Sequence, residues 1–196
     1  MTKQERLDIL YTEYKREFEG NEIVLGEGNL DAVLLLIGAA PGRDEVKLGS
    51  PFVGMAGKNL TEFLEVLEVE RASIFITNAI KFRLSKVNPK TGQKVNRPAT
   101  REEIESNRKY VLEEIDIIRP ELIVTLGNVP LKSVTGNYSA NIGSSHGEIQ
   151  AIDIMDRTCK LFPLYHPASI IYNQGLKNTY YEDIQRLKKI LEGSKK

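Results

Sequence analysis

The chain has 196 residues, and its 27 lysine and arginine residues balance 27 aspartate and glutamate residues, so its formal net charge is zero. Hydrophobic residues make up 41% of the sequence, enough to build the core of a single domain spanning residues 1–196. No apolar run approaches the roughly 20 residues of a membrane-spanning helix. Because the first twenty residues carry charge throughout, they do not resemble a signal peptide. We therefore expect a cytoplasmic, monomeric protein with no membrane contact.

Cysteine and histidine are scarce. Cys159 is the only cysteine, so one chain can form neither an internal disulfide nor a cluster held by several cysteines. A zinc site built on the two histidines, His146 and His166, would need several carboxylates as well. We expect no metal site and no cofactor.

Apolar runs alternate with amphipathic stretches along the chain. Apolar residues at three- and four-residue spacing predict helices over 3–18, around 60–67, over 100–118 and over 177–191. Continuous apolar runs predict strands over 32–37, 73–78 and 122–126, with two more strands within 147–165, the last over 160–165. Buried strands separated by helices favour a three-layer α/β/α sandwich with a central, mostly parallel sheet. In such sheets, ligands bind beyond the carboxyl ends of the strands.

The loop after the first strand is rich in glycine and proline. It reads Gly38-Ala39-Ala40-Pro41-Gly42 and continues to Gly49-Ser50-Pro51-Phe52-Val53-Gly54. Small residues let the backbone approach a ligand closely, and Phe52 is placed to stack on a flat ring. The alternative is that glycine and proline only turn the chain and that Phe52 fills the core. Residues 54–59 lack the spacing of a Walker A loop, which disfavours a nucleoside triphosphatase.

Two further strand ends carry polar side chains. The amide of Asn78 can bond two adjacent edge atoms of a nucleobase, unless it only caps a turn. His166 leaves the last strand before Pro167, which holds the histidine backbone extended and gives the imidazole a fixed direction. His146 lies in a polar loop without comparable support, and we interpret it as a surface residue.

Residues 81–101 contain seven basic side chains and no acidic one: Lys81, Arg83, Lys86, Lys90, Lys94, Arg97 and Arg101. Because this stretch follows the strand that ends at Asn78, it must emerge at the same edge of the sheet. A cationic loop beside a flat-ring pocket favours a nucleic acid whose base enters the pocket. A solvated surface loop is the alternative.

These segments resemble the uracil-DNA glycosylase superfamily, and within it the iron-sulfur branch known as family 4. The first motif of that branch is matched by residues 38–42, by Asp44 and Glu45, and by residues 49–57. The second is matched by Asn78-Ala79-Ile80-Lys81. The third is matched by His166-Pro167-Ala168, with Ser169 one place late. The resemblance covers roughly residues 23–190.

The chain departs from that branch in two respects. The four cysteines that bind the cluster are missing, and Phe82 and Asn107 stand at two of their positions. We expect the helix over 3–18 and ordinary packing to replace the cluster. In addition, Ala39 stands in place of the carboxylate beside the reacting water, which puts the rate, the water-activating group and the base specificity in question.

The resemblance implies hydrolysis of the N-glycosidic bond of a deaminated base in DNA, with uracil as the expected base. His166 would stabilise the departing base, and Glu45 or Asp44 would position water, Glu45 being preferred. The base would lie against Gly38, Ala39, Ala40, Pro41, Phe52 and Asn78. The DNA would lie against Lys81, Arg83, Lys86, Lys90, Lys94, Arg97 and Ser169, with residues 170–173 inserting into the duplex.

Three other functions stay open. The protein could be a glycosylase for hypoxanthine or xanthine, because Ala39 enlarges and neutralises one wall of the pocket. It could be a damaged-DNA-binding protein that has lost catalysis with the missing carboxylate. It could also be a nucleotide-binding domain with no role on DNA.

Overall fold

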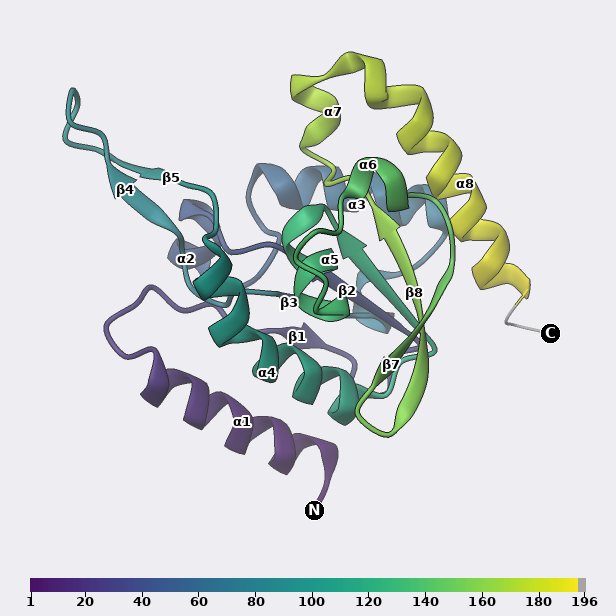
Figure 1. The fold of residues 1–196 in the computed structure, drawn as a ribbon, viewed down its shortest axis with the longest axis horizontal. Helices are drawn as coiled ribbons and strands as arrows, with labels where there is room; N and C mark the ends of the chain where they lie inside the picture. The colour runs from purple at the N-terminus through teal and green to yellow at the C-terminus, as the bar shows by residue number, and fades with distance from the viewer. Residues whose placement is uncertain (194–196) are drawn as a thin grey trace.

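A six-stranded sheet forms the centre of the protein (Figure 1). The computed structural model describes residues 1–193, without the side chains of residues 55, 56, 171 and 172. The strand order is β1-β3-β2-β6-β8-β7. The bounds are β1 Glu27–Gly28, β2 Leu34–Gly38, β3 Phe75–Asn78, β6 Leu122–Leu126, β7 Gln150–Ile154 and β8 Arg157–Leu164. The four inner strands run parallel and the two edge strands antiparallel, which confirms the predicted mostly parallel sheet.

Helices cover both faces of this sheet. Leu35 and Ile37 of β2 point into a core shared with α1 (Lys3–Glu17), α4 (Arg101–Ile118) and α5 (Asn128–Thr135). Leu34 and Leu36 point the opposite way, into a core shared with α3 (Met55–Leu67) and α8 (Lys177–Gly193). This alternation along one strand confirms the three-layer architecture. The connections contain α2 (Arg43–Leu48), α6 (Ile142–Ser145), α7 (Ser169–Tyr172) and the 3-10 turns η1 (Arg71–Ser73) and η2 (Gln174–Leu176).

The element boundaries follow the local signals with small shifts. α4 begins after Thr100, whose hydroxyl accepts from the Glu103 N–H while the Glu103 carboxylate accepts from the Thr100 N–H. That reciprocal cap fixes the start of the helix. The strand predicted over 73–78 begins later, because residues 71–73 form η1. The last strand begins earlier than predicted, at Arg157.

Residues 81–101 contain a hairpin where the sequence indicated only a basic loop. β4 (Ser85–Val87) pairs antiparallel with β5 (Lys94–Asn96), and the pair projects away from the main sheet (Figure 1). Strands of three largely exposed residues bury no apolar face. Their sequence therefore lacks the alternation that reveals longer strands.

Packed aromatic rings fill the region where the resemblance places two cluster cysteines. The ring of Phe82 lies 5.2 Å from that of Phe18, and the ring of Tyr14 lies 4.6 Å from Phe18 and 4.8 Å from Tyr110. The Tyr14 hydroxyl also donates to the side-chain oxygen of Asn107. Contacts between α1, α4 and Phe82 therefore stand in place of the cluster, as expected.

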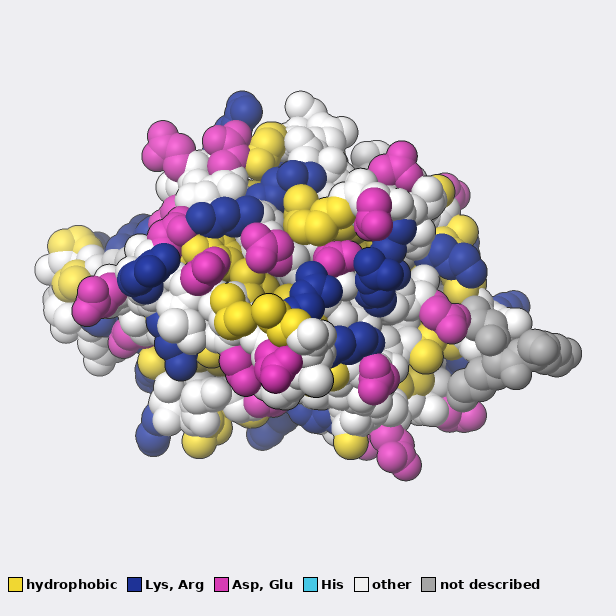
Figure 2. All heavy atoms as spheres, turned by 90° about the horizontal axis from the view of Figure 1, so that it is seen from below, with side chains coloured by type: hydrophobic (Ala, Val, Ile, Leu, Met, Phe, Trp, Pro, Cys, Tyr) yellow, Lys and Arg dark blue, Asp and Glu magenta, His cyan; other side chains and the backbone are white. Residues whose placement is uncertain are grey.

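Charged side chains of both signs are interspersed on the face seen in Figure 2, in keeping with the zero net charge of the chain. Within residues 1–193, none of the helices is long and apolar enough to cross a membrane.

Candidate active site

A cavity of about 480 Å³ opens beyond the carboxyl ends of the parallel strands. β3 and β6 pair with opposite edges of β2, so the chain order reverses here, which is where ligands bind in sheets of this kind. The cavity brings together Phe52, Asn78 and His166, three residues far apart in the sequence. The full lining is Ala40, Pro41, Gly42, Arg43, Asp44, Glu45, Phe52, Asn78, Arg83, Lys94, Val95, Asn96 and His166.

Asn78 ends β3 with its side chain at the cavity. The residue is only 3% exposed, and its amide forms no hydrogen bond with any side chain or backbone group of residues 1–193. A Cβ at Gly38 would lie 2.4 Å from the Asn78 Oδ1, so only glycine at the end of β2 leaves room for this amide. The amide is open to the cavity, where water or a ligand can satisfy it. It is therefore available to the edge of a bound base.

Phe52 is held in an unusual backbone conformation. Its φ is 53°, a region that residues other than glycine rarely adopt. Arg71 of η1 donates to the carbonyl of Pro51 at 2.7 Å and to the carbonyl of Phe52 at 3.4 Å. The Phe52 ring lies nearly parallel to the His166 ring, with the centroids 6.3 Å apart. Strained residues persist where the surroundings over-determine them, as they often do at functional sites.

His166 is a neutral hydrogen-bond donor. Burial lowers the pKa of His166 below its ordinary value, and the nearby charge of Glu45 only partly opposes this. The backbone N–H of Ala168 donates to Nδ1 at 3.1 Å. Because Nδ1 accepts that bond, the proton of the neutral ring lies on Nε2. The imidazole therefore presents one N–H donor.

The two acidic residues of the cavity have different surroundings. Glu45 is 7% exposed, and its two carboxylate oxygens accept from the N–H groups of Gly42 at 3.1 Å and Gly54 at 3.3 Å. It thereby ties the two ends of its loop together. The Asp44 side chain is 48% exposed, and within residues 1–193 it pairs only with its exposed neighbour Arg43, at 3.3 Å. Of the two acids, Asp44 is the more accessible to water.

Gly38 and Ala39 act through the backbone rather than as cavity walls. Their carbonyls accept from the N–H groups of Ala79 at 2.8 Å and Ile80 at 3.0 Å, which ties the end of β2 to the turn after β3. Among the residues predicted to bind the base, Ala40 and Pro41 line the cavity with Phe52 and Asn78.

The prediction that Lys81 contacts DNA is wrong. The residue is fully buried, and its Nζ forms an ion pair with Glu114 at 2.8 Å and donates to the carbonyl of Asn78 at 3.0 Å. The hydroxyls of Tyr11 and Thr77 also donate to the Glu114 carboxylate. Lys81 therefore fixes the end of β3 from inside the protein, where no phosphate can reach it.

The other basic residues differ in exposure to solvent and in whether an acidic side chain lies close to them. Lys86 and Lys90 are exposed and form no ion pair within residues 1–193. Lys94 lies 3.6 Å from Glu22, and the nearly buried side chain of Arg83 lies 3.8 Å from the same carboxylate.

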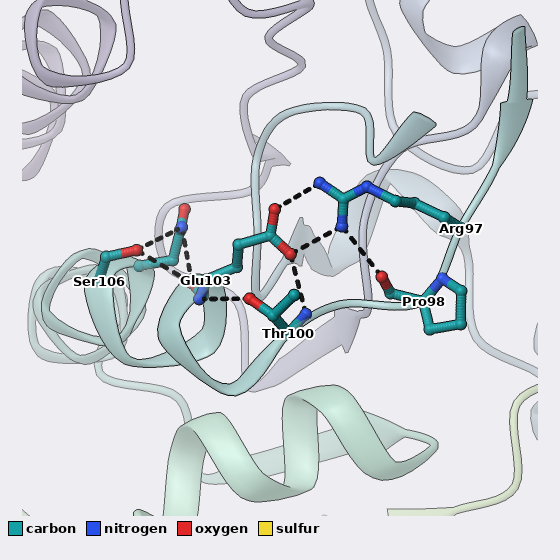
Figure 3. A network of polar contacts seen from close by, with 6 residues as sticks. Arg97, Pro98, Thr100, Glu103 and Ser106 are labelled. Atoms are coloured by element: carbon teal, nitrogen blue, oxygen red, sulfur yellow. Dashed lines mark hydrogen bonds and ion pairs between the residues drawn. The ribbon is translucent and has the colours of Figure 1, made fainter. Parts of the chain in front are cut away.

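Arg97 and Ser169 also make bonds within the protein. The Arg97 guanidinium forms two bonds with Glu103, at 2.6 and 2.9 Å, and a third with the carbonyl of Pro98 (Figure 3). These contacts make Arg97 an anchor between β5 and α4 rather than a free cation. The Ser169 N–H donates to the carbonyl of His166 at 2.7 Å, close to the cavity. The segment 170–173 follows directly, with the side chains of residues 171 and 172 outside the described structure.

His146 is not the surface residue that its polar loop indicated. Its Nδ1 lies 2.6 Å from the Oδ2 of Asp183 in α8, and its ring packs against Tyr165 at 4.7 Å. The side chain is 22% exposed. Because Asp183 lies almost forty residues away in sequence, no local pattern could reveal this contact.

Sequence reasoning did not assign five residues at or beside the cavity to the site: Gly42, Arg43, Val95, Asn96 and Arg71. Val95 and Asn96 belong to β5, and a hairpin reading of the turn-forming residues 88–93 would have pointed to them. Arg71 acts through carbonyl groups about twenty positions away, for which the sequence carries no local signal.

An iron-sulfur cluster does not fit this chain. Cys159, the only cysteine, is buried in β8, while Phe82 and Asn107 occupy two of the positions that the resemblance assigns to cluster cysteines. Residues 1–193 contain no group of three or more histidine, cysteine, aspartate or glutamate side chains that could hold a metal ion.

Comparison with known proteins agrees with this arrangement. The profile described as "Uracil DNA glycosylase superfamily" matches residues 25–187. A type-4 uracil-DNA glycosylase of Sulfurisphaera tokodaii is 36% identical over 171 residues, covering 85% of this chain and 74% of the relative. One of Thermotoga maritima is 31% identical over 199 residues, covering 97% of each chain. A type-5 uracil-DNA glycosylase of Pyrobaculum aerophilum is 27% identical, covering 76% of this chain and 66% of the relative. The chain belongs to the uracil-DNA glycosylase superfamily.

Proposed function

We propose that the protein hydrolyses the N-glycosidic bond of uracil in DNA after the nucleotide rotates out of the helix. Enzymes that act on a base must extract it from the stack in this way. The observation that carries the proposal is the unpartnered amide of Asn78 in the same cavity as the Phe52 and His166 rings. Because all of these groups come from one chain, we infer that a monomer suffices.

Base recognition falls to Asn78 and Phe52. The amide oxygen of Asn78 accepts from the uracil N3–H, and its NH₂ group donates to O4. Cytosine presents the opposite pattern at these two positions, so its entry leaves buried polar atoms unpaired. The Phe52 ring stacks on the base, and such stacking is worth about 1–3 kcal/mol.

Bond cleavage places negative charge on the departing base and positive charge on the sugar. The Nε2–H of His166 donates to the base O2 and stabilises the developing anion. A donor of this kind typically contributes about 3–4 kcal/mol to the transition state. The neutral state of His166 suits this role, since the ring donates without transferring a proton.

A carboxylate must orient the attacking water and offset the charge on the sugar. We assign this role to Asp44 in preference to Glu45, because both oxygens of Glu45 already accept backbone N–H groups. The absence of a carboxylate at position 39 predicts slower hydrolysis than a chain carrying one there would show.

The test is release of free base from matched duplexes that contain uracil, hypoxanthine or xanthine. The proposal predicts release of uracil in preference to the two purines. Release of hypoxanthine alone would assign the other base class. Tight retention of uracil DNA with no released base would show a binding protein and contradict the proposal.

A further inference from the structure

The β4–β5 hairpin is a stiff ribbon that extends from the wall of the cavity. Val95 and Asn96 line the cavity, and Lys86 pairs directly across the ribbon with Val95. Directly opposed residues share a face of a β-ribbon, so Lys86 lies on the same face as Val95, beside the cavity. At the tip, the Asn88 N–H donates to the carbonyl of Gln93 at 2.8 Å and the Gly92 N–H to the carbonyl of Asn88 at 2.8 Å. These bonds fix the turn.

The base of the ribbon is fastened to the body of the protein. Arg97, directly after β5, binds Glu103 at the start of α4 through both terminal nitrogens (Figure 3). Arg83, just before β4, donates to the side-chain oxygen of Asn96 at 3.0 Å. Leu84 is buried in the core between them. The direction of the hairpin is therefore set by the fold.

The hairpin carries two exposed lysines that form no ion pair within residues 1–193. These two are Lys86 and Lys90, whereas Lys94, one cross-strand pair further out than Lys86, lies 3.6 Å from Glu22. No acidic residue occurs between positions 81 and 101. Lys86 therefore lies beside the cavity wall and Lys90 lies in the turn beyond it, and both charges are available to a ligand.

We propose that the β4–β5 hairpin is an arm that binds the phosphates of duplex DNA beside the flipped nucleotide, with Lys86 and Lys90 as its contacts. The inference rests on the proposed function and adds a contact that favours double-stranded over single-stranded DNA as the substrate. A stiff arm needs phosphates at fixed positions, which a duplex supplies. A flexible single strand would have to be ordered first, at a cost in conformational entropy.

The length of the hairpin sets the distance over which it can contact DNA. Gly92 in the turn lies four positions before Asn96 at the cavity, and extended chain rises about 3.3 Å per residue. The turn therefore lies roughly 13 Å from Asn96, or about four base pairs along a duplex. Base pairs within that distance on one side of the uracil should therefore contribute to the affinity for duplex DNA.

The experiment compares affinity for duplex and single-stranded DNA carrying 2′-fluoro-deoxyuridine, whose fluorine prevents bond cleavage. The variant is Lys86→Ala/Lys90→Ala. Its matched control, Lys160→Ala/Lys189→Ala, removes two equally exposed lysines from the outer part of β8 and from α8. Each phosphate contact contributes about 0.9 to the slope of log affinity against log salt concentration.

For the hairpin variant, the duplex slope should fall by about 1.8. Between about 50 and 200 mM salt, the wild type should then lose ~12-fold more duplex affinity than the variant does. The ratio of duplex to single-strand affinity should also fall, while the control variant keeps the wild-type slope and ratio. Cutting the duplex to about two base pairs on one side of the uracil should weaken the wild type and leave the hairpin variant little changed.

An unchanged duplex slope, or equal losses on duplex and single strand, would overturn the assignment of the arm. A wild type that binds duplex through the hairpin yet releases no uracil would support the arm and overturn the proposed function. The two failures are therefore distinguishable.

Discussion

The buried ion pair between Lys81 and Glu114 gives a quantitative test of the structure. Both side chains are fully buried, and the Lys81 Nζ also holds the carbonyl of Asn78. Glu114→Gln removes the negative charge and leaves the lysine charge in the core without its partner. Breaking a buried pair in this way typically costs about 3–5 kcal/mol of unfolding free energy.

In a protein of this size, about 1 kcal/mol shifts the melting temperature by roughly 2–4 °C. The variant should therefore melt about 6–20 °C below the wild type. The assay is thermal unfolding followed by circular dichroism, with urea unfolding as a second measure of the free energy. Glu105→Gln is the control, because its ion pair with Arg101 lies on the surface of α4 and water solvates both partners.

A melting temperature for Glu114→Gln as close to the wild type as that of Glu105→Gln would refute the reasoning. Lys81 would then be accessible to solvent, and its predicted contact with DNA would have to be considered again. The double variant Lys81→Met/Glu114→Leu should recover much of the lost stability, because well-packed apolar side chains can replace a buried pair.

Four further predictions concern the cavity. Asn78→Ala should cost about 1–3 kcal/mol, roughly 5- to 150-fold in kcat/KM for uracil release, because the base edge loses its partner. Arg71→Ala should slow uracil release in the wild type, because Arg71 binds the carbonyls of Pro51 and Phe52. In a Phe52→Ala background the same change should add nothing, and fully additive losses would refute the inference that Arg71 acts by holding Phe52. Burial lowers the pKa of His166 in the folded protein. As pH falls through 6.5, the ordinary pKa of histidine, the unfolded chain therefore binds a proton that the folded protein does not bind. As pH decreases below that value, the free energy of unfolding measured with urea should therefore decrease more steeply in the wild type than in His166→Asn. Ala39→Glu should accelerate release by about 10²-fold if the missing carboxylate limits the rate, and an unchanged rate would exclude that limit.

The sequence predicted the layers and the three strand ends because their signals are local. Apolar runs indicated β2, β3 and β6. Parallel strands have their carboxyl ends at one edge of the sheet, independently of their side chains. The sequence alone therefore predicts that Phe52, Asn78 and His166 share one cavity, and the cavity contains all three.

Contacts between distant segments could not be predicted in the same way. Charge alone grouped Lys81 with the hairpin lysines, yet burial depends on Glu114, more than thirty residues later. The same holds for His146, whose partner Asp183 lies in the last helix. Composition shows that a basic stretch exists but does not reveal which of its cations face solvent.

The most direct test of the account measures uracil release from one duplex by the wild type, Asn78→Ala and His166→Ala at equal concentrations of folded protein. The account predicts that the wild type releases free uracil, that His166→Ala is slower by about 10²–10³-fold, and that Asn78→Ala is also slower. Absence of release by the wild type, or variants that match its rate, would contradict the claim that these side chains act together on one extruded base.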